Sequence, residues 1–137
     1  MRKFKFLEHT ADIKFQAYGK DIEEAFENSA LAMFNSMYNS KIKDKEKFKI
    51  IVQGKDFESL LYNFLEELLF LLDSKNFFLS KIKNIKINKR RLKLEAEILG
   101  DDAKNYPISL NVKAITYNQM FVKKQENKWI TQIVLDV

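Results

Sequence analysis

The chain has 137 residues, 46% of them hydrophobic and 31% charged, and its formal net charge is +5. This length is typical of one domain with a sizeable core, and we expect a single domain over residues 1–137. Without cysteine, and with His9 as the sole histidine, the chain cannot supply disulfides or a cysteine- and histidine-rich zinc site. No segment resembles a signal peptide or a membrane span, so we expect a cytoplasmic protein without a membrane partner.

Two helices are predicted in the first half of the chain. Asp21 and Asp56 each follow a glycine closely and are typical N-cap residues. After both, apolar residues recur at helical spacing, which predicts helices over residues 21–38 and 56–74. The second helix is apolar around much of its circumference, Phe70 included, so we expect it to be largely buried. The phenylalanines of both helices are expected to pack in the core.

The rest of the chain alternates between apolar and polar residues, as strands do. This alternation predicts strands near residues 13–17, 47–53, 92–98, 110–116 and 129–137. The segment 81–87 slips out of phase, which indicates a β-bulge near Asn84. The order is two strands, a helix, a strand, a helix and then four or five strands. It indicates the α+β class, a single domain with two helices and a mainly antiparallel sheet.

Acidic groups near both ends of the chain form a candidate metal site. The last strand continues to the end of the chain, so we expect the Val137 carboxylate to be held in the sheet beside Asp136. If Asp12 joins them, three carboxylates provide the oxygen ligands that Ca²⁺ and Mg²⁺ prefer. The alternative is that Asp12 only begins a strand while Asp136 faces solvent. From the residues alone both interpretations stay open, because nothing local brings the two ends together.

Two basic features also have two interpretations. Lys113 is an ordinary exposed lysine unless the acidic cluster lies beside it, where it would serve as a counter-ion or a phosphate contact. The basic run of residues 81–93 could neutralise RNA phosphates. Most such runs, however, are the solvated face and turn of a hairpin, and residues 88–91 are typical of such a turn, so we favour this interpretation. The open function classes are therefore a metal-binding accessory protein, a metal-dependent phosphoesterase, and an RNA-binding or chaperone-like module.

Four stretches of the chain resemble the archease family. They are the Glu-His-Thr-Ala-Asp element at residues 8–12, the helical segments 21–34 and 60–70, and the Val-Lys-Ala-Ile-Thr-Tyr segment 112–117 with the Asp-Val end. The helical segments alone are weak signals. The order and spacing of His-Thr-Ala-Asp, Lys-Ala-Ile-Thr-Tyr and the final Asp-Val are specific, and the resemblance covers nearly the whole chain.

This resemblance implies a function. Archeases are accessory proteins of the RtcB-type tRNA-splicing ligase, so the chain would promote guanylylation and multiple turnover of that ligase in tRNA ligation. It would not itself be an enzyme, and it would meet RNA through the ligase. The resemblance also implies that Asp12, Asp136 and the Val137 carboxylate bind Ca²⁺, with Mg²⁺ as the second candidate. Lys113 would be the family's functional lysine, and His9 would orient Asp12 through a hydrogen bond.

Overall fold

The computed structural model describes residues 2–9 and 11–137. In chain order its elements are β1 (Phe4–Leu7), β2 (Ile13–Gly19), α1 (Ile22–Met37), β3 (Glu46–Gln53), α2 (Phe57–Lys75), β4 (Phe77–Asn88), β5 (Lys93–Asp102), a short 3-10 turn at Ala103–Asn105, β6 (Ala114–Gln125) and β7 (Lys128–Asp136). This is the order expected of the α+β class, and each helix lies within one residue of its predicted range.

Side-chain caps explain where the helices begin. The Asp21 carboxylate accepts a hydrogen bond of 2.9 Å from the Glu24 N–H, and Glu24 in turn accepts one of 2.9 Å from the Lys20 N–H. At α2, Asp56 accepts a bond of 2.7 Å from the Ser59 N–H, and the Ser59 hydroxyl accepts one of 3.1 Å from the Asp56 N–H. Both caps satisfy N–H groups that the first helical turn leaves without partners.

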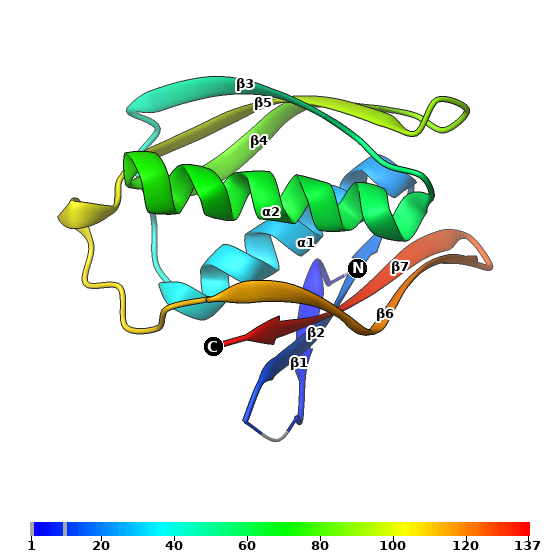
Figure 1. The fold of residues 1–137 in the computed structure, drawn as a ribbon, viewed down its shortest axis with the longest axis horizontal. Helices are drawn as coiled ribbons and strands as arrows, with labels where there is room; N and C mark the ends of the chain where they lie inside the picture. Colours follow the sequence, from blue (N-terminus) through cyan, green and yellow to red (C-terminus); the bar gives the residue numbers. More distant parts are fainter. Residues whose placement is uncertain (1, 10) are drawn as a thin grey trace.

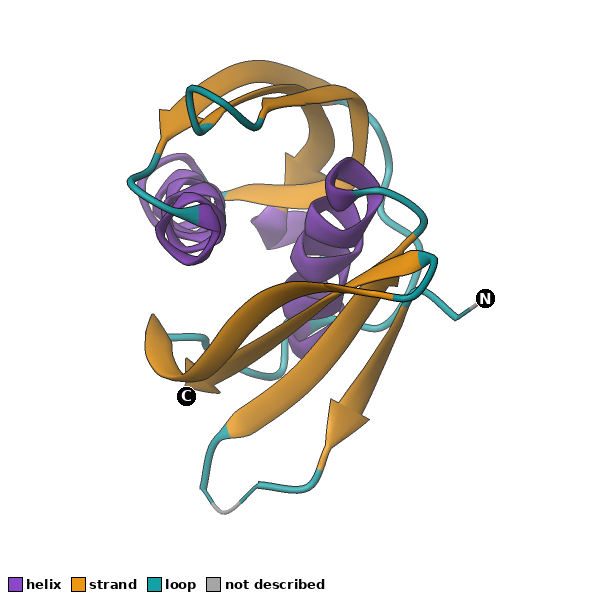
Figure 2. Ribbon diagram, turned by 90° about the vertical axis from the view of Figure 1, so that its right-hand side faces the viewer, coloured by secondary structure: helices purple, strands orange, loops and turns teal. Residues whose placement is uncertain are grey.

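The described strands pair antiparallel throughout and form two sheets. One sheet has the order β1-β2-β7-β6 and the other the order β3-β5-β4. Figures 1 and 2 show α1 and α2 side by side between them, as a middle layer. Because each helix is apolar on more than one side, each can bury surface against both sheets.

The core lies between the layers and is rich in phenylalanine. Phe15, Phe26, Phe64 and Phe77 are fully buried, and the rings of Phe26 on α1 and Phe64 on α2 stack with centroids 6.3 Å apart. The expectation that Phe70 packs inside is wrong, since its side chain is 59% exposed. Phe70 lies on the stripe of α2 that neither sheet covers. Within the described part of the chain, no helix is both long and apolar enough to cross a bilayer.

Two predictions about the strands can be compared with the structure. The predicted bulge is confirmed, because Asn84 has a φ of +53° and the pairing of β4 with β5 shifts register between Lys83 and Lys86. The strand predicted from residue 110 begins only at Ala114. The residues before Ala114 carry the chain from one sheet to the other, and the Ser109 N–H there donates to the Met37 carbonyl at the end of α1. The alternation of apolar and polar residues over 110–113 therefore reflects alternate burial in the connection between the two sheets, not a strand.

Candidate metal centre

The register of three adjacent strands places the two ends of the chain side by side. Leu135 on β7 pairs with Ile13 on β2 and, on its other side, with Ile115 on β6. Asp12 directly precedes Ile13, and Asp136 directly follows Leu135. In an antiparallel pair these are neighbouring positions at the same end of the two strands, where opposed Cα atoms lie about 4.5–5.5 Å apart.

Lys113 joins this end of the sheet from the third strand. Ala114 pairs with Asp136, and the Lys113 N–H donates a hydrogen bond of 2.8 Å to the Asp136 carbonyl oxygen. The Lys113 side chain is exposed, whereas Val137 is half-buried and packs against the core. Figure 1 shows the C-terminus beside the beginning of β6. The backbone thus gathers Asp12, Lys113, Asp136 and Val137 at one end of the sheet.

The side chain of His9 lies close to that of Asp12. Its Nδ1 lies 3.5 Å from Asp12 Oδ2, and the two side chains are 19% and 32% exposed. This Nδ1 is buried, and among the described residues it has no hydrogen-bond partner. Ala11, between them in the chain, has a φ of +64°, an uncommon value outside glycine. Thr10 of the same motif lies outside the described residues.

The donor chemistry fits a hard cation only if a main-chain carboxylate takes part. In residues 2–9 and 11–137, no three histidine, cysteine, aspartate or glutamate side chains come together as a metal-binding group. Asp12 and Asp136 are two carboxylates, and the third predicted ligand is the carboxylate of Val137. Buried polar atoms normally have a hydrogen-bond partner, and Nδ1 of His9 has none among the described residues. A bound ion that fixed the Asp12 carboxylate could provide that partner, since Asp12 lies beside His9.

A comparison with protein-family models assigns nearly the whole chain to one family. Residues 4–137 match the model of the Archease protein family. The chain belongs to the archease family. "Protein archease" of Methanosarcina barkeri is 41% identical, with 99% of this chain and 97% of that protein covered. "Protein archease" of Pyrococcus furiosus is also 41% identical, over the whole of both chains.

Solved structures agree with this assignment. The solution structure of protein 1598 of Methanobacterium thermoautotrophicum matches this archease with a TM-score of 0.84 and 34% identity over the whole of both chains. The crystal structure described as "an archease, possible chaperone" from Thermotoga maritima has a TM-score of 0.67 and 20% identity, covering all of this chain and 98% of that one. The latter identity supports a shared fold and nothing more.

Polar side chains that the sequence did not single out lie close to the candidate centre. The Lys14 Nζ donates to Gln119 Oε1 at 2.7 Å, and the Gln132 amide donates to the Gln119 carbonyl at 2.8 Å. Gln16 continues this network by donating to Gln132 Oε1 at 2.9 Å. Lys14 and Asp12 also border one shallow cavity of about 310 Å³. The alternation of Lys14 and Gln16 along β2 was the available signal, since it marks a polar outer face.

Tyr117, which closes the Lys-Ala-Ile-Thr-Tyr motif, belongs to a different contact. Its ring stacks on Tyr62 of α2, with centroids 4.4 Å apart and an interplanar angle of 6°. Burial raises the pKa of the Tyr117 phenol, and the carboxylates of Asp56 and Glu66 raise it further. This part of the motif therefore packs β6 against the middle layer, whereas the backbone of Lys113 is hydrogen-bonded to that of Asp136.

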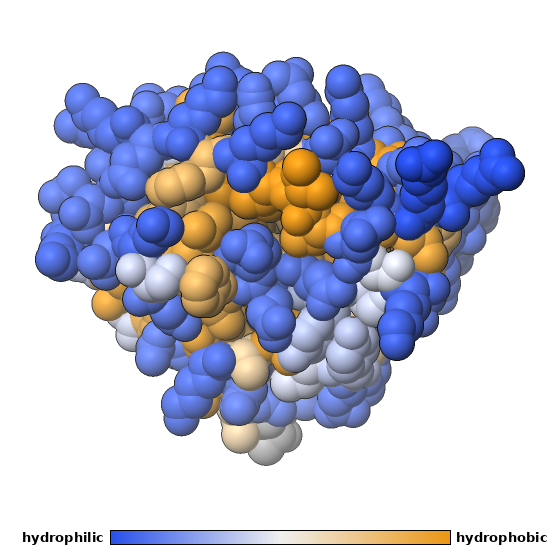
Figure 3. Space-filling model, turned by 45° about the horizontal axis from the view of Figure 1, so that its top comes forward, coloured by the Kyte–Doolittle hydropathy of each residue, from blue (hydrophilic) through white to orange (hydrophobic). Residues whose placement is uncertain are grey.

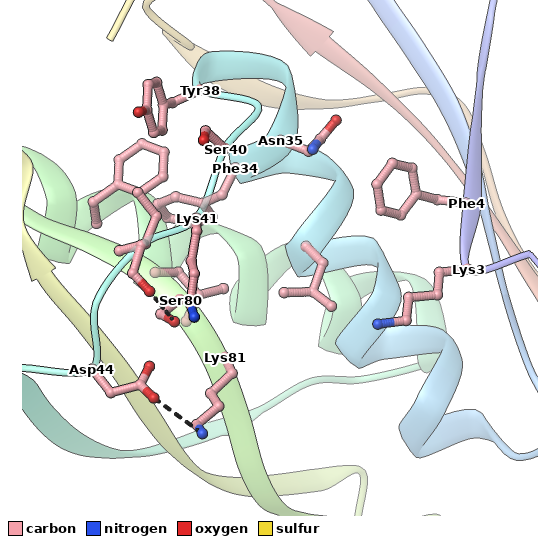
Figure 4. A pocket seen from close by; sticks show the side chains of 14 residues that line it. Lys3, Phe4, Phe34, Asn35, Tyr38, Ser40, Lys41, Asp44, Ser80 and Lys81 are labelled. Carbon is pink, nitrogen blue, oxygen red and sulfur yellow. Dashed lines mark hydrogen bonds and ion pairs between the residues drawn. The ribbon is translucent and has the colours of Figure 1, made fainter. Parts of the chain in front are cut away.

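A separate cavity of about 420 Å³ opens over α1, between β1 and β4. Figure 4 shows Lys3 and Phe4 on one wall, with Lys41 and Lys81 on the other. The Lys81 ammonium lies 3.0 Å from the Asp44 carboxylate. This cavity shares no lining residue with the one beside Asp12, so it is not part of the candidate centre.

Proposed function

We propose that this archease is a cytoplasmic, metal-binding accessory protein that activates an RtcB-type tRNA-splicing ligase, promoting its guanylylation and multiple turnover in tRNA ligation. The observation that carries the proposal is the register across β2, β7 and β6. It supports the convergence of Asp12, Asp136 and Lys113, which come from distant parts of the chain.

In this proposal Asp12, Asp136 and the Val137 carboxylate hold a Ca²⁺ ion. Calcium takes six to eight oxygen ligands in flexible geometry, so three carboxylates and a few waters complete its shell. Mg²⁺ is the second candidate, but it demands near-ideal octahedral geometry. Either ion offsets the mutual repulsion of carboxylates that would otherwise lie close together. With the ion bound, His9 would orient Asp12 through a hydrogen bond from Nδ1, which lies 3.5 Å from Asp12 Oδ2.

The bound ion links the start of β2 to the end of β7, and the archease then presents a rigid patch with Lys113 at its rim. An exposed lysine ammonium suits a phosphate contact, because it is a compact charge with three donors. We assign this contact to the nucleotide-binding region of the ligase, and catalysis to the ligase itself. The archease acts by favouring the ligase conformation that reacts with the guanine nucleotide.

The test is a tRNA-ligation assay with the cognate ligase. We expect wild-type archease to stimulate guanylylation and turnover, and Asp12→Asn and Asp136→Asn to lose most of that stimulation while remaining folded. Glu126→Gln is the matched control, because Glu126 lies in the turn between β6 and β7, at the opposite end of β7. Full stimulation by both aspartate variants would reject the proposal. Hydrolysis of RNA or nucleotide by the archease alone, lost in Asp12→Asn, would instead indicate a phosphoesterase.

A further inference from the structure

The outer face of the β3-β5-β4 sheet is unusually rich in lysine. Along the central strand β5, Leu94, Ala96 and Ile98 are buried, so the residues between them face outward. The register then places lysines of β3 and β4 on either side of these outward residues. Lys47 and Lys81, for example, both pair with Leu99. In the described part of the chain this face gathers Lys47, Lys49, Lys81, Lys83, Lys86 and Lys93.

Few carboxylates oppose these charges. On β5, Glu97 lies 3.5 Å from the Lys47 ammonium and also receives a hydrogen bond from Asn84. The hydrogen bond from Asn84 is the main cause that lowers the pKa of Glu97, and the charge of Lys47 lowers it further. Lys81 pairs with Asp44 at the margin of the sheet. Lys49, Lys83 and Lys86 form no ion pair within the residues that the structure describes.

The turn between β4 and β5 extends the same face. The Asn88 side chain accepts hydrogen bonds of 3.1 and 3.0 Å from the N–H groups of Arg90 and Arg91, which fixes the turn. Lys89 lies over the ring of Trp129 on β7, 5.2 Å from its centroid, so its side chain points toward the other sheet. The turn thus adds Arg90 and Arg91 to this face. With the six sheet lysines they form what we call the lysine face.

The net charge of the protein resides on this face. The lysine face has eight basic residues and, with Asp44, Glu95 and Glu97, three acidic ones. The rest of the chain has the remaining sixteen basic and sixteen acidic residues, which cancel. Charges that served only to keep the protein in solution would be spread over its whole surface. Figure 3 shows this side of the molecule, on which hydrophilic side chains surround a central hydrophobic patch.

We propose that the lysine face binds the phosphate backbone of double-helical RNA. Alternate residues of a strand lie about 6.6 Å apart, and β3 and β4 lie two strand spacings, about 9.6 Å, apart on either side of β5. The lysines therefore form two rows, of which the β4 row is offset at the Asn84 bulge. Two rows of positive charge suit a ligand whose negative charges repeat along two strands, as the phosphates of a double helix do. Double-stranded RNA is bound mainly through such backbone contacts across its wide, shallow minor groove.

Other features of the face argue against base reading and against membranes. Its exposed large apolar side chain is Ile51, 53% exposed. The ring of Trp129 beneath Lys89 belongs to β7 of the other sheet and packs edge-on against Phe57, so it is not a platform for base stacking on this face. The face also lacks the set of large apolar side chains that a membrane-surface protein inserts between lipids. The interaction is therefore sequence-independent and strongly dependent on salt. It does not require the proposed metal ion.

The experiment is fluorescence anisotropy of a labelled tRNA transcript over a range of salt concentrations. The test variant combines Lys49→Gln, Lys83→Gln and Lys86→Gln, which leave both ion pairs of the face intact. The matched control combines Lys5→Gln, Lys104→Gln and Lys124→Gln, which remove the same charge from exposed lysines elsewhere. A third variant, Glu95→Gln, removes a negative charge from the face.

We expect the test variant to lose at least about tenfold in affinity near 100 mM salt, and its salt slope to fall by about 2. The control variant should bind like the wild type, and Glu95→Gln should bind several-fold tighter. A gain of affinity is not produced by unfolding, so this variant keeps the test meaningful if the triple variant is unstable. Equal losses in the test and control variants would overturn the proposal. So would equal or tighter binding to B-form DNA or to anionic phosphatidylserine vesicles.

Because this face and the metal centre are separate, their failures are distinguishable. We expect Asp136→Asn to retain tRNA binding while losing ligase stimulation, and the triple lysine variant to retain metal binding. If Asp136→Asn lost tRNA binding while the lysine variant kept it, RNA would contact the metal centre, and the proposal that the lysine face binds RNA would be rejected.

Discussion

The Lys113 N–H donates a hydrogen bond of 2.8 Å to the carbonyl oxygen of Asp136. This bond continues the pairing of β6 with β7 one step beyond the paired Ala114 and Asp136. Lys113, proposed to contact phosphate, and Asp136, proposed to bind the ion, are therefore joined by the backbone hydrogen bonds between β6 and β7. A displacement of the β7 end would therefore move both.

Calcium is expected to stabilise the archease against heat. Binding to the folded state alone contributes about 2.7 kcal/mol when free Ca²⁺ is 100 times its Kd. For a domain of this size that corresponds to a rise in Tm of roughly 10 °C. Asp136→Asn should lose most of this shift, whereas Glu126→Gln should keep it. Differential scanning calorimetry with Ca²⁺, Mg²⁺ or chelator measures the effect, and an undiminished shift in Asp136→Asn would exclude that ligand.

Extra residues after Val137 are expected to weaken metal binding. They turn the carboxylate of Val137 into a peptide carbonyl, which removes a full negative charge from the proposed ligand set. Calorimetric titration of an extended chain with Ca²⁺ should show at least about a tenfold loss of affinity. The same residues added at the N-terminus serve as the control. Unchanged affinity in the C-terminal extension would mean that Val137 is not a ligand.

Thr131→Val is expected to destabilise the fold by about 1–2 kcal/mol. The hydroxyls of Thr131 on β7 and Ser29 on α1 lie 2.7 Å apart, and both residues are fully buried. Valine preserves the shape but removes the hydroxyl, so this hydrogen bond between α1 and β7 is lost. Urea denaturation of Thr131→Val, Ser29→Ala and the double variant measures the coupling. Additive losses would show that the two hydroxyls do not interact.

Asp101 is expected to make stability fall in acid. Its carboxylate accepts hydrogen bonds of 2.7 Å from the Tyr106 hydroxyl and 2.8 Å from the Asp102 N–H, and these lower its pKa. A carboxyl whose pKa is depressed by folding stabilises the protein above its ordinary pKa, near 4, and loses that contribution as pH falls through the folded value. Thermal unfolding between about pH 5 and 2 should therefore show a shallower decline in Asp101→Asn than in the wild type.

The comparison for this prediction is Asp73→Asn, which changes an exposed carboxyl on α2. Its decline with acid should follow that of the wild type. Identical pH profiles for Asp101→Asn and the wild type would contradict the role given to the Tyr106 and Asp102 hydrogen bonds.

Local sequence information was sufficient for most of the elements. Asp21 and Asp56 predicted the helix starts because capping depends on bonds within one turn. The loss of phase near Asn84 predicted a bulge because strand alternation has a period of two. The His-Thr-Ala-Asp and Lys-Ala-Ile-Thr-Tyr motifs indicated the archease family, which the family model confirms. Metal binding and ligase activation stay predictions.

Relationships between distant residues were decided by the tertiary structure alone. No local pattern reveals that Leu135 pairs with both Ile13 and Ile115, since pairing depends on how sheets assemble around the helices. The exposure of Phe70 follows from the gap that the sheets leave over α2, although its helical spacing suggests burial. Likewise the basic run of residues 81–93 becomes a lysine face only when β3 adds Lys47 and Lys49 across β5. Sequence determines which segments form helices and strands; packing determines which side chains meet, because contact energies come from neighbours far apart in the chain.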